Sequence, residues 1–243
     1  ATLICHDNGP VLVTDPWLVG DAYFGSWTLA YEIPDRQMEH IKQCEFVWLS
    51  HGHPDHLSIK SLRLLQDKKI LLTDHVGSRI ARDLEQLKFN VTVLKDRVWT
   101  QLSSRIKVLS LSDYNQDGIL LVDINGTLVL DLNDSSPRGW GGFIKNIASQ
   151  YKETFLLQIA GYGDADMINY FNEDGQRIEP RAALKLPVGA TVGRVADAFN
   201  VRYVIPFSSL HKYQRADSVW ANEYTTPLEN YYDGFASKKC QYL

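Results

Sequence analysis

Apolar residues alternate along the first hundred positions between short strand-like runs and helical patterns. Runs of strand length that end in polar or turn residues predict strands at residues 1–6, 11–15, 46–49, 69–73 and 91–94. Apolar positions three or four residues apart predict helices at residues 35–44, 58–65 and 76–87. The turn-rich residues 7–10 join the first two strands as a hairpin. Such alternation is typical of an α/β arrangement.

The middle of the chain has a different pattern, because its strands follow one another without helices between them. We predict strands at residues 106–109, 118–124 and 127–132, the last two joined by an Asn125-Gly126 hairpin turn. Helices are expected at residues 143–151 and 188–199, and strands at residues 155–159 and 202–205. This order of strands and helices fits two β-sheets packed face to face with helices on the outside. The pattern therefore predicts an α/β (α+β) protein, and we expect a single domain over residues 1–243.

Composition narrows the class of protein. The 243 residues are 44% hydrophobic and 22% charged, which is ordinary for a globular chain with a substantial core. No apolar stretch approaches the length of a bilayer crossing, so membrane insertion is not expected. A net charge of -4 argues against binding to nucleic acid. The three widely spaced cysteines, Cys5, Cys44 and Cys240, fit a reducing compartment, and we expect a cytoplasmic protein.

The candidate chemistry is concentrated in six residues, His51-Gly-His53-Pro-Asp55-His56, directly after the strand at 46–49. In an extended chain, His51 and His53 project to the same side, and a turn at Pro54 returns Asp55 and His56 toward the same cavity. Clustering three imidazoles and a carboxylate is costly unless a cation or hydrogen bonds compensate them. The hexapeptide predicts a site for one or two divalent cations; the alternative is a surface loop rich in histidine.

This hexapeptide is the HxHxDH signature, and the chain resembles metallo-β-lactamase-fold proteins. Residues 13–18, with Gly20 and Trp27, are similar to the strand and loop that precede the signature in one branch of that superfamily. The branch includes the metallo-β-lactamase-like part of CMP-N-acetylneuraminate hydroxylases and, more distantly, ascorbate-phosphate lactonases and N-acylphosphatidylethanolamine phospholipase D. The resemblance implies an αββα four-layer sandwich, with a further strand or segment expected before Ala1.

The resemblance also indicates where the other ligands of a binuclear site belong. Asp134, just past the strand at 127–132, stands at the expected position of a bridging carboxylate, and Asp131 is its competitor. A histidine is expected before Gly118, but Asp113 occupies that position. Either Asp113 is a ligand, which would favour iron, manganese or magnesium over zinc, or it is a loop residue and that cation position is weakened.

Three further features concern the surroundings of the site. His211, after the turn at residues 206–209, is expected to complete the cation site of Asp55 and His56, although the hydroxylase resemblance places this ligand nearer Gln214. Asp15 is expected to support the metal histidines from beneath. An aromatic loop is expected near the cleft mouth, and the remaining histidines are expected to be structural. These residues are Trp17, Tyr23, Phe24 and Trp27 in the loop, and His6, His40 and His75.

Three functions are compatible with these residues. The first is a metal-dependent hydrolase, in which cations lower the pKa of a bound water and Asp55 orients it toward a small-molecule ester, lactone, amide or phosphodiester. The second is a non-haem diiron oxygenase-type protein acting on a nucleotide sugar or related metabolite. The third is a weakened metal- or ligand-binding module, motivated by the missing histidine. Zinc is the first expected metal and iron or manganese the next, while a homo-oligomer or an additional domain is left open.

Overall fold

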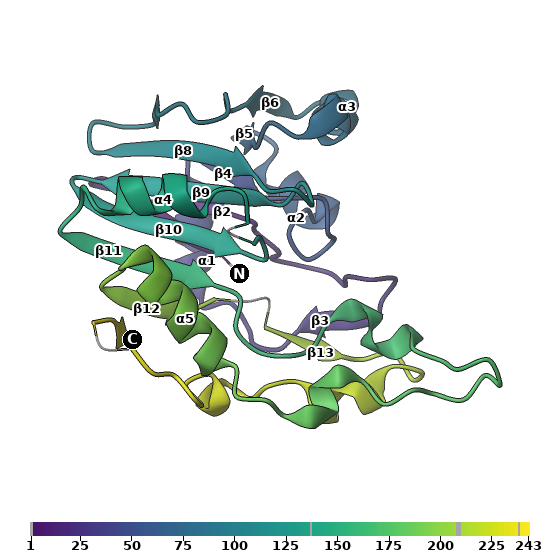
Figure 1. Ribbon diagram of the computed structural model, residues 1–243. Helices are drawn as coiled ribbons and strands as arrows, with labels where there is room; N and C mark the ends of the chain where they lie inside the picture. Colours follow the sequence, from purple (N-terminus) through teal and green to yellow (C-terminus); the bar gives the residue numbers. More distant parts are fainter. Residues whose placement is uncertain (1, 137, 208–209, 238) are drawn as a thin grey trace.

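Two β-sheets pack face to face and carry helices on both outer faces (Figure 1). The computed structural model describes residues 2–136, 138–207, 210–237 and 239–243. Within this part of the chain, one sheet has five strands in the order β1-β2-β4-β5-β6, and the other has seven in the order β14-β12-β11-β10-β9-β8-β7. The arrangement confirms the predicted four-layer αββα sandwich.

The first sheet comes from the alternating part of the chain. Its strands are β1 (Ile4–His6), β2 (Pro10–Thr14), β4 (Phe46–Leu49), β5 (Lys69–Leu72) and β6 (Asn90–Val93). The first two form the expected antiparallel hairpin, and the other pairs are parallel because a helix or loop crossover separates them. The outer face is covered by α1 (Asp35–Gln43), α2 (Ile59–Leu62), η1 (Arg63–Leu65) and α3 (Arg79–Gln86), and the exposed turn η2 (Val76–Ser78) precedes α3.

The second sheet begins as an antiparallel meander and continues with parallel strands. Its strands are β7 (Thr100–Gln101), β8 (Ile106–Ser112), β9 (Gly118–Ile124), β10 (Thr127–Asn133), β11 (Glu153–Gln158), β12 (Tyr203–Pro206) and β14 (Gln241–Tyr242). Asn125 and Gly126 both have positive φ, 52° and 87°, as the predicted turn requires. Helices α4 (Gly141–Ala148) and α5 (Gly189–Phe199) pack on the outer face.

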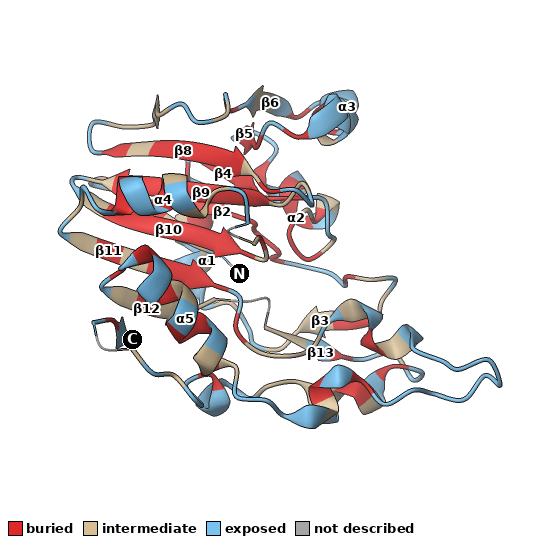
Figure 2. Ribbon diagram, viewed as in Figure 1, coloured by how far each residue is buried: buried red, intermediate tan, exposed pale blue. Residues whose placement is uncertain are grey.

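The central core lies between the two sheets, where the strands are buried along most of their length (Figure 2). Leu12 and Trp48 of the first sheet meet Leu120 and Val122 of the second, and all four are fully buried. Burying a side chain of this size stabilises the fold by about 1.5–3 kcal/mol. The sandwich therefore provides a rigid frame whose strand ends can hold functional groups.

One element pair was not predicted from the sequence. Strands β3 (Trp27–Leu29) and β13 (His211–Tyr213) form a separate antiparallel ribbon beside the sandwich (Figure 1). It packs with the 3-10 turns that follow β11 through a small cluster that includes Trp17, Met167 and Ala221. These turns and their neighbours are η3 (Ala165–Asn169), η4 (Arg181–Leu184), η5 (Val219–Tyr224) and η6 (Leu228–Asn230).

Two predicted helix boundaries were wrong. The predicted helix at 143–151 is α4, which begins at Gly141 and ends at Ala148. The predicted helix at 76–87 is divided, because Gly77 and Ser78 have left-handed backbones with φ of 75° and 49°. Of the predicted turn at 206–209, Ser208 and Ser209 lie outside the described residues. None of the helices in the described ranges has the length and apolar character that crossing a bilayer requires.

Candidate metal centre

The signature residues lie where β4 ends, beside the end of β2 and opposite the end of β10. The chain folds back at Pro54, because the backbone N–H groups of His56 and Leu57 both donate to the carbonyl oxygen of His53, at 3.0 and 2.7 Å. This turn places the rings of His51 and His56 with their centroids 4.2 Å apart. The chain thus folds back at Pro54, as the sequence predicts.

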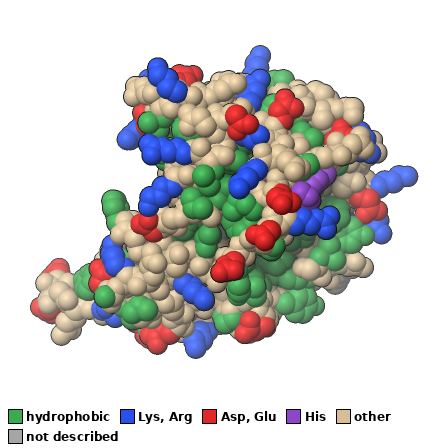
Figure 3. Space-filling view, turned by 180° about the vertical axis from the view of Figure 1, so that it is seen from behind, with side chains coloured by type: hydrophobic (Ala, Val, Ile, Leu, Met, Phe, Trp, Pro, Cys, Tyr) green, Lys and Arg blue, Asp and Glu red, His purple; other side chains and the backbone are tan. Residues whose placement is uncertain are grey.

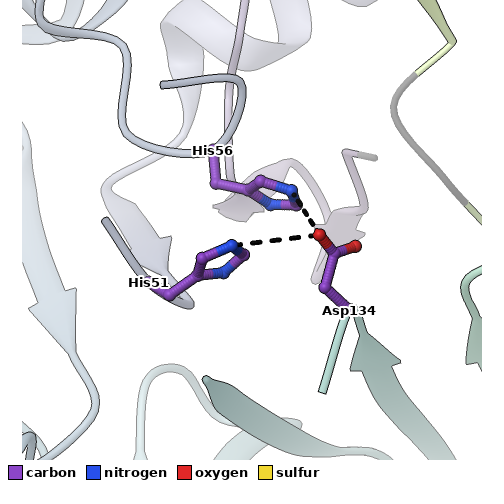
Figure 4. A group of neighbouring side chains, drawn as sticks. All are labelled: His51, His56 and Asp134. Atoms are coloured by element: carbon purple, nitrogen blue, oxygen red, sulfur yellow. Dashed lines mark ion pairs between the residues drawn. The ribbon is translucent and has the colours of Figure 1, made fainter. Parts of the chain in front are cut away.

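Three side chains from two different sheets converge on one point (Figure 4). His56 Nε2 lies 3.2 Å from Asp134 Oδ2, and His51 Nε2 lies 3.9 Å from the same oxygen. Asp55 Oδ2 is also 3.2 Å from His56 Nε2. Ligand atoms about 2.0–2.2 Å from a shared tetrahedral cation lie about 3.3–3.6 Å apart, so this spacing fits a single divalent cation.

The protons on His51 follow from its neighbours. Asp15 is an acceptor, so the Ser50 hydroxyl donates to Asp15 Oδ2 at 2.6 Å, and the Ser50 oxygen accepts from His51 Nδ1 at 2.8 Å. The unprotonated Nε2 of His51 then accepts from His53 Nδ1 at 2.8 Å and lies 3.9 Å from Asp134 Oδ2. Burial lowers the pKa of His51 to about 4, which keeps the ring neutral and able to bind a metal.

His56 lies against three carboxylates, those of Asp15, Asp55 and Asp134. Its Nδ1 lies 3.0 Å from Asp15 Oδ2, to which it donates. Its fully buried Nε2 faces Asp55 and Asp134 but makes no hydrogen bond among the described residues. A nitrogen lone pair and two carboxylates repel one another unless a proton or a metal ion lies between them. Burial lowers the pKa of His56, but Asp15, Asp134 and Asp55 together raise it well above its ordinary value.

Asp15 and Asn133 hold this pair of histidines from beneath. Both are fully buried, and Asn133 Nδ2 donates to Asp15 Oδ2 at 2.5 Å. Both also have left-handed backbones, with φ of 41° and 48°, a conformation that surrounding contacts must enforce. The supporting position of Asp15 agrees with the sequence prediction. Asn133 was missed, although asparagine at a strand end is suited to this backbone conformation.

The two aspartates before β9 have different surroundings. The Asp113 carboxylate accepts backbone N–H groups of Asn115, Asp117 and Ser136 at 2.7, 3.0 and 3.0 Å. These bonds favour the loop interpretation of Asp113. Burial, together with the charge of Asp113, raises the pKa of Asp117 to about 6. Asp117 was not singled out from the sequence, and it is not part of the compact cluster found among the described residues.

A cavity of about 930 Å³ opens onto the cluster. Its floor includes His53, Asp55, Asp134 and His211, and its walls include the loop that follows β11. The His211 ring stacks on Trp27, with centroids 3.4 Å apart and planes 8° from parallel. His211 thus shares the cavity with the signature residues but is not part of the compact cluster found among the described residues.

The aromatic loop is only partly at the cavity. Tyr23 and Trp27 line it, whereas Trp17 is buried in the small cluster and Phe24 is 97% exposed. The Tyr23 hydroxyl donates to Asp55 Oδ1 at 2.8 Å. Burial and the charge of Asp55 raise the pKa of Tyr23, so the hydroxyl keeps its proton.

The remaining polar candidates lie outside the compact cluster. Asp131 is fully buried in β10, where neither carboxylate oxygen has a hydrogen-bond partner among the described residues, and Asp134 is the carboxylate that meets the histidines. His75 Nε2 lies 3.0 Å from the carbonyl oxygen of Ser50, and the His6 and His40 rings contact each other edge to face. On the face shown in Figure 3, acidic and basic side chains are interspersed without a broad field of one sign.

The sequence of this chain is similar to part of several curated hydroxylases. Cytidine monophosphate-N-acetylneuraminic acid hydroxylase of Cricetulus griseus is 27% identical over 160 residues, which are 62% of this chain and 28% of that protein. The Asterias rubens protein is 29% identical over 139 residues, or 53% and 21%. The matched region is thus about a quarter of the length of these relatives. No protein-family model matches the chain.

Solved structures show that the fold is shared with both hydroxylases and hydrolases. CmlA, a diiron β-hydroxylase from Streptomyces venezuelae, aligns with a TM-score of 0.56 and 15% identity over 84% of this chain and 42% of CmlA. Isothiocyanate hydrolase from Delia radicum gut bacteria aligns with a TM-score of 0.53 and 15% identity over 86% and 81%. At these identities the likeness concerns the fold.

Proposed function

From the metallo-β-lactamase fold of this chain and the His/Asp cluster at its cavity, we propose a metal-dependent hydrolase acting on a small-molecule ester, lactone, amide or phosphodiester. The observation that carries this proposal is the buried Nε2 of His56, which lies 3.2 Å from a carboxylate oxygen of both Asp55 and Asp134, so that a proton or a metal ion must lie between them. A bound divalent cation would lower the pKa of a water molecule and polarise the bond to be cleaved. His51, His56 and Asp134 would hold it, and Asp55, whose Oδ2 lies 3.2 Å from His56 Nε2, would add a further ligand.

Two features of the site would support hydrolysis: a carboxylate that can orient water, and a cavity that can enclose a substrate. Asp55 lies at the boundary between the cluster and the cavity, so its carboxylate can orient a water molecule toward a substrate. The cavity volume of about 930 Å³ is near the upper end of small-molecule sites, which suits a metabolite-sized substrate. Hydrolysis needs water as its only co-substrate, so it requires no electron donor beyond this chain.

A second candidate is oxygen-dependent hydroxylation at two iron ions. It is favoured by the carboxylates Asp55 and Asp134 beside His56, because oxygen-rich sites suit iron better than zinc, and by the likeness to hydroxylases. The electrons for such a reaction would come from another protein or domain.

Reconstitution of metal-free protein separates the two candidates. The protein is loaded in turn with zinc, manganese or ferrous iron and assayed against chromogenic ester, lactone and phosphodiester substrates. We expect hydrolysis that a chelator abolishes and that Asp134→Ala lowers by at least about a hundredfold, because this variant loses a ligand. Asp83→Ala, which removes an exposed carboxylate on α3, is the matched control. Hydrolysis that is indifferent to metal and to Asp134→Ala would exclude the proposal, whereas oxygen consumption by the reduced iron form without hydrolysis would favour the hydroxylase.

A further inference from the structure

We infer that Tyr23 is a positioning residue for Asp55: its hydroxyl holds one carboxylate oxygen so that the other is presented to the cation of His56. The inference rests on the proposed metal function and adds to it a residue that fixes how one ligand is oriented. The contact joins the aromatic loop before β3 to the signature after β4, two segments that lie 32 residues apart in sequence.

The two oxygens of Asp55 have different partners. Oδ1 accepts the Tyr23 hydroxyl at 2.8 Å, and Oδ2 lies 3.2 Å from His56 Nε2. Asp55 is buried, so the carboxylate is not held by bulk water. A donor on one oxygen limits rotation of the carboxylate and thereby fixes the direction of the other oxygen.

The backbone around Tyr23 is strained in a way that serves this contact. Tyr23, Phe24 and Gly25 have consecutive positive φ values of 48°, 57° and 82°. Side chains other than glycine rarely adopt this conformation, and a run of it is kept only where surrounding contacts enforce it. Here the tight turn directs the Tyr23 hydroxyl toward Asp55 while the Phe24 side chain points to solvent.

Contacts from a distant segment enforce the turn. Ala22 and Trp27 exchange two backbone hydrogen bonds of 3.1 Å, which close the loop. Gln214, after β13, donates its backbone N–H to the Ser26 carbonyl at 2.8 Å and its side-chain amide to the Gly25 carbonyl at 3.1 Å. Arg215 donates to the Phe24 carbonyl at 3.1 Å. Hydrogen bonds from Gln214 and Arg215 therefore hold the turn at the carbonyl oxygens of Phe24, Gly25 and Ser26.

Packing alone does not explain the position of Tyr23. Its ring contacts Trp27 edge to face, with centroids 4.5 Å apart, and a phenylalanine would preserve this contact. The hydroxyl is what reaches the signature. Tyr23→Phe therefore separates packing from positioning.

The test is a metal competition titration of Tyr23→Phe and wild type with Co²⁺ against a chelating dye. We expect the variant to bind Co²⁺ on the order of 10- to 100-fold less tightly than wild type. Its visible Co²⁺ spectrum should also differ, because the orientation of Asp55 is lost. Tyr151→Phe is the matched control. It also removes a hydroxyl that donates to a carboxylate, at 2.9 Å to Asp123, but far from the cluster, so Co²⁺ binding should be unchanged.

A second variant protects the test against misfolding of the first. Gly25→Ala keeps the Tyr23 hydroxyl but places a side chain at a φ of 82°, which strains the turn, whereas its Cβ would meet only an ordinary contact of 3.4 Å with Asp21 Oδ2. It should weaken Co²⁺ binding in the same direction. Equal Co²⁺ binding and spectra in wild type and Tyr23→Phe would overturn the inference while leaving the proposed function intact. Wild type that binds no Co²⁺ would overturn both.

Discussion

At the residue scale, Asp15 joins more parts of the candidate site than any of the ligands does. It is fully buried and accepts hydrogen bonds from the backbone N–H and hydroxyl of Ser50, from His56 and from Asn133. Each of these groups belongs to a segment that carries a ligand or supports one. Asp15 therefore fixes the geometry of the histidines without touching a cation.

Asp15→Asn replaces an acceptor oxygen by a donor amide that faces other donors. We expect the free energy of unfolding to fall by about 2–4 kcal/mol, the range for disrupting a buried charged hydrogen-bond network. Urea unfolding in the presence of a chelator measures this loss independently of metal binding. Asp21→Asn is the control, since Asp21 makes an exposed ion pair with Lys60 and should contribute less than about 1 kcal/mol. Equal losses in the two variants would show that the buried network is not stabilising.

At the element scale, an element was predicted correctly where its own sequence contains a local signal, such as a turn motif or a long apolar run. The hairpin at Asn125-Gly126 and the strand before His51 were correctly predicted, because turn chemistry and long apolar runs are local signals. Strands β3 and β13 have three residues each and are held by contacts with distant turns, so no local pattern indicates them. Their absence from the prediction also concealed the stack of His211 on Trp27.

The β9–β10 hairpin carries an acid-sensitive contact. Asp123 accepts the Gly126 N–H at 2.8 Å and the Tyr151 hydroxyl at 2.9 Å, and pairs with Lys107 at 3.2 Å. Burial raises the pKa of Asp123, but these three partners lower it more, so its folded-state pKa lies below the ordinary value. Its stabilisation is therefore complete above about pH 4 and is lost as the pH falls through the folded-state pKa.

We expect Asp123→Asn to lower the free energy of unfolding by about 1–2 kcal/mol at pH 7 and by progressively less as the pH falls below about 4. Thermal unfolding of both proteins at pH 7 and near pH 3 measures the difference. A gap between wild type and variant that stays constant over this range would assign the loss to packing instead of charge.

At the scale of the whole molecule, the site is assembled from the ends of two sheets. The HxHxDH signature was visible in the sequence because its four polar residues fall within six consecutive positions, and the αββα sandwich followed from the family resemblance. Asn133 could not be identified from the sequence, because only the folded chain shows that its side chain lies beside His56. The single-domain organisation over residues 1–243 and the small-molecule substrate stay predictions.

The most direct test of the central claim is anomalous diffraction from crystals of the protein loaded with zinc or manganese. We expect an anomalous peak within about 2.0–2.3 Å of His51 Nε2 or His56 Nε2 and of an Asp134 oxygen, facing the cavity. In crystals of Asp134→Ala the peak should weaken or disappear. Fully occupied metal elsewhere on the chain with none at this cluster, or no bound metal at all, would contradict the assignment of a metal centre.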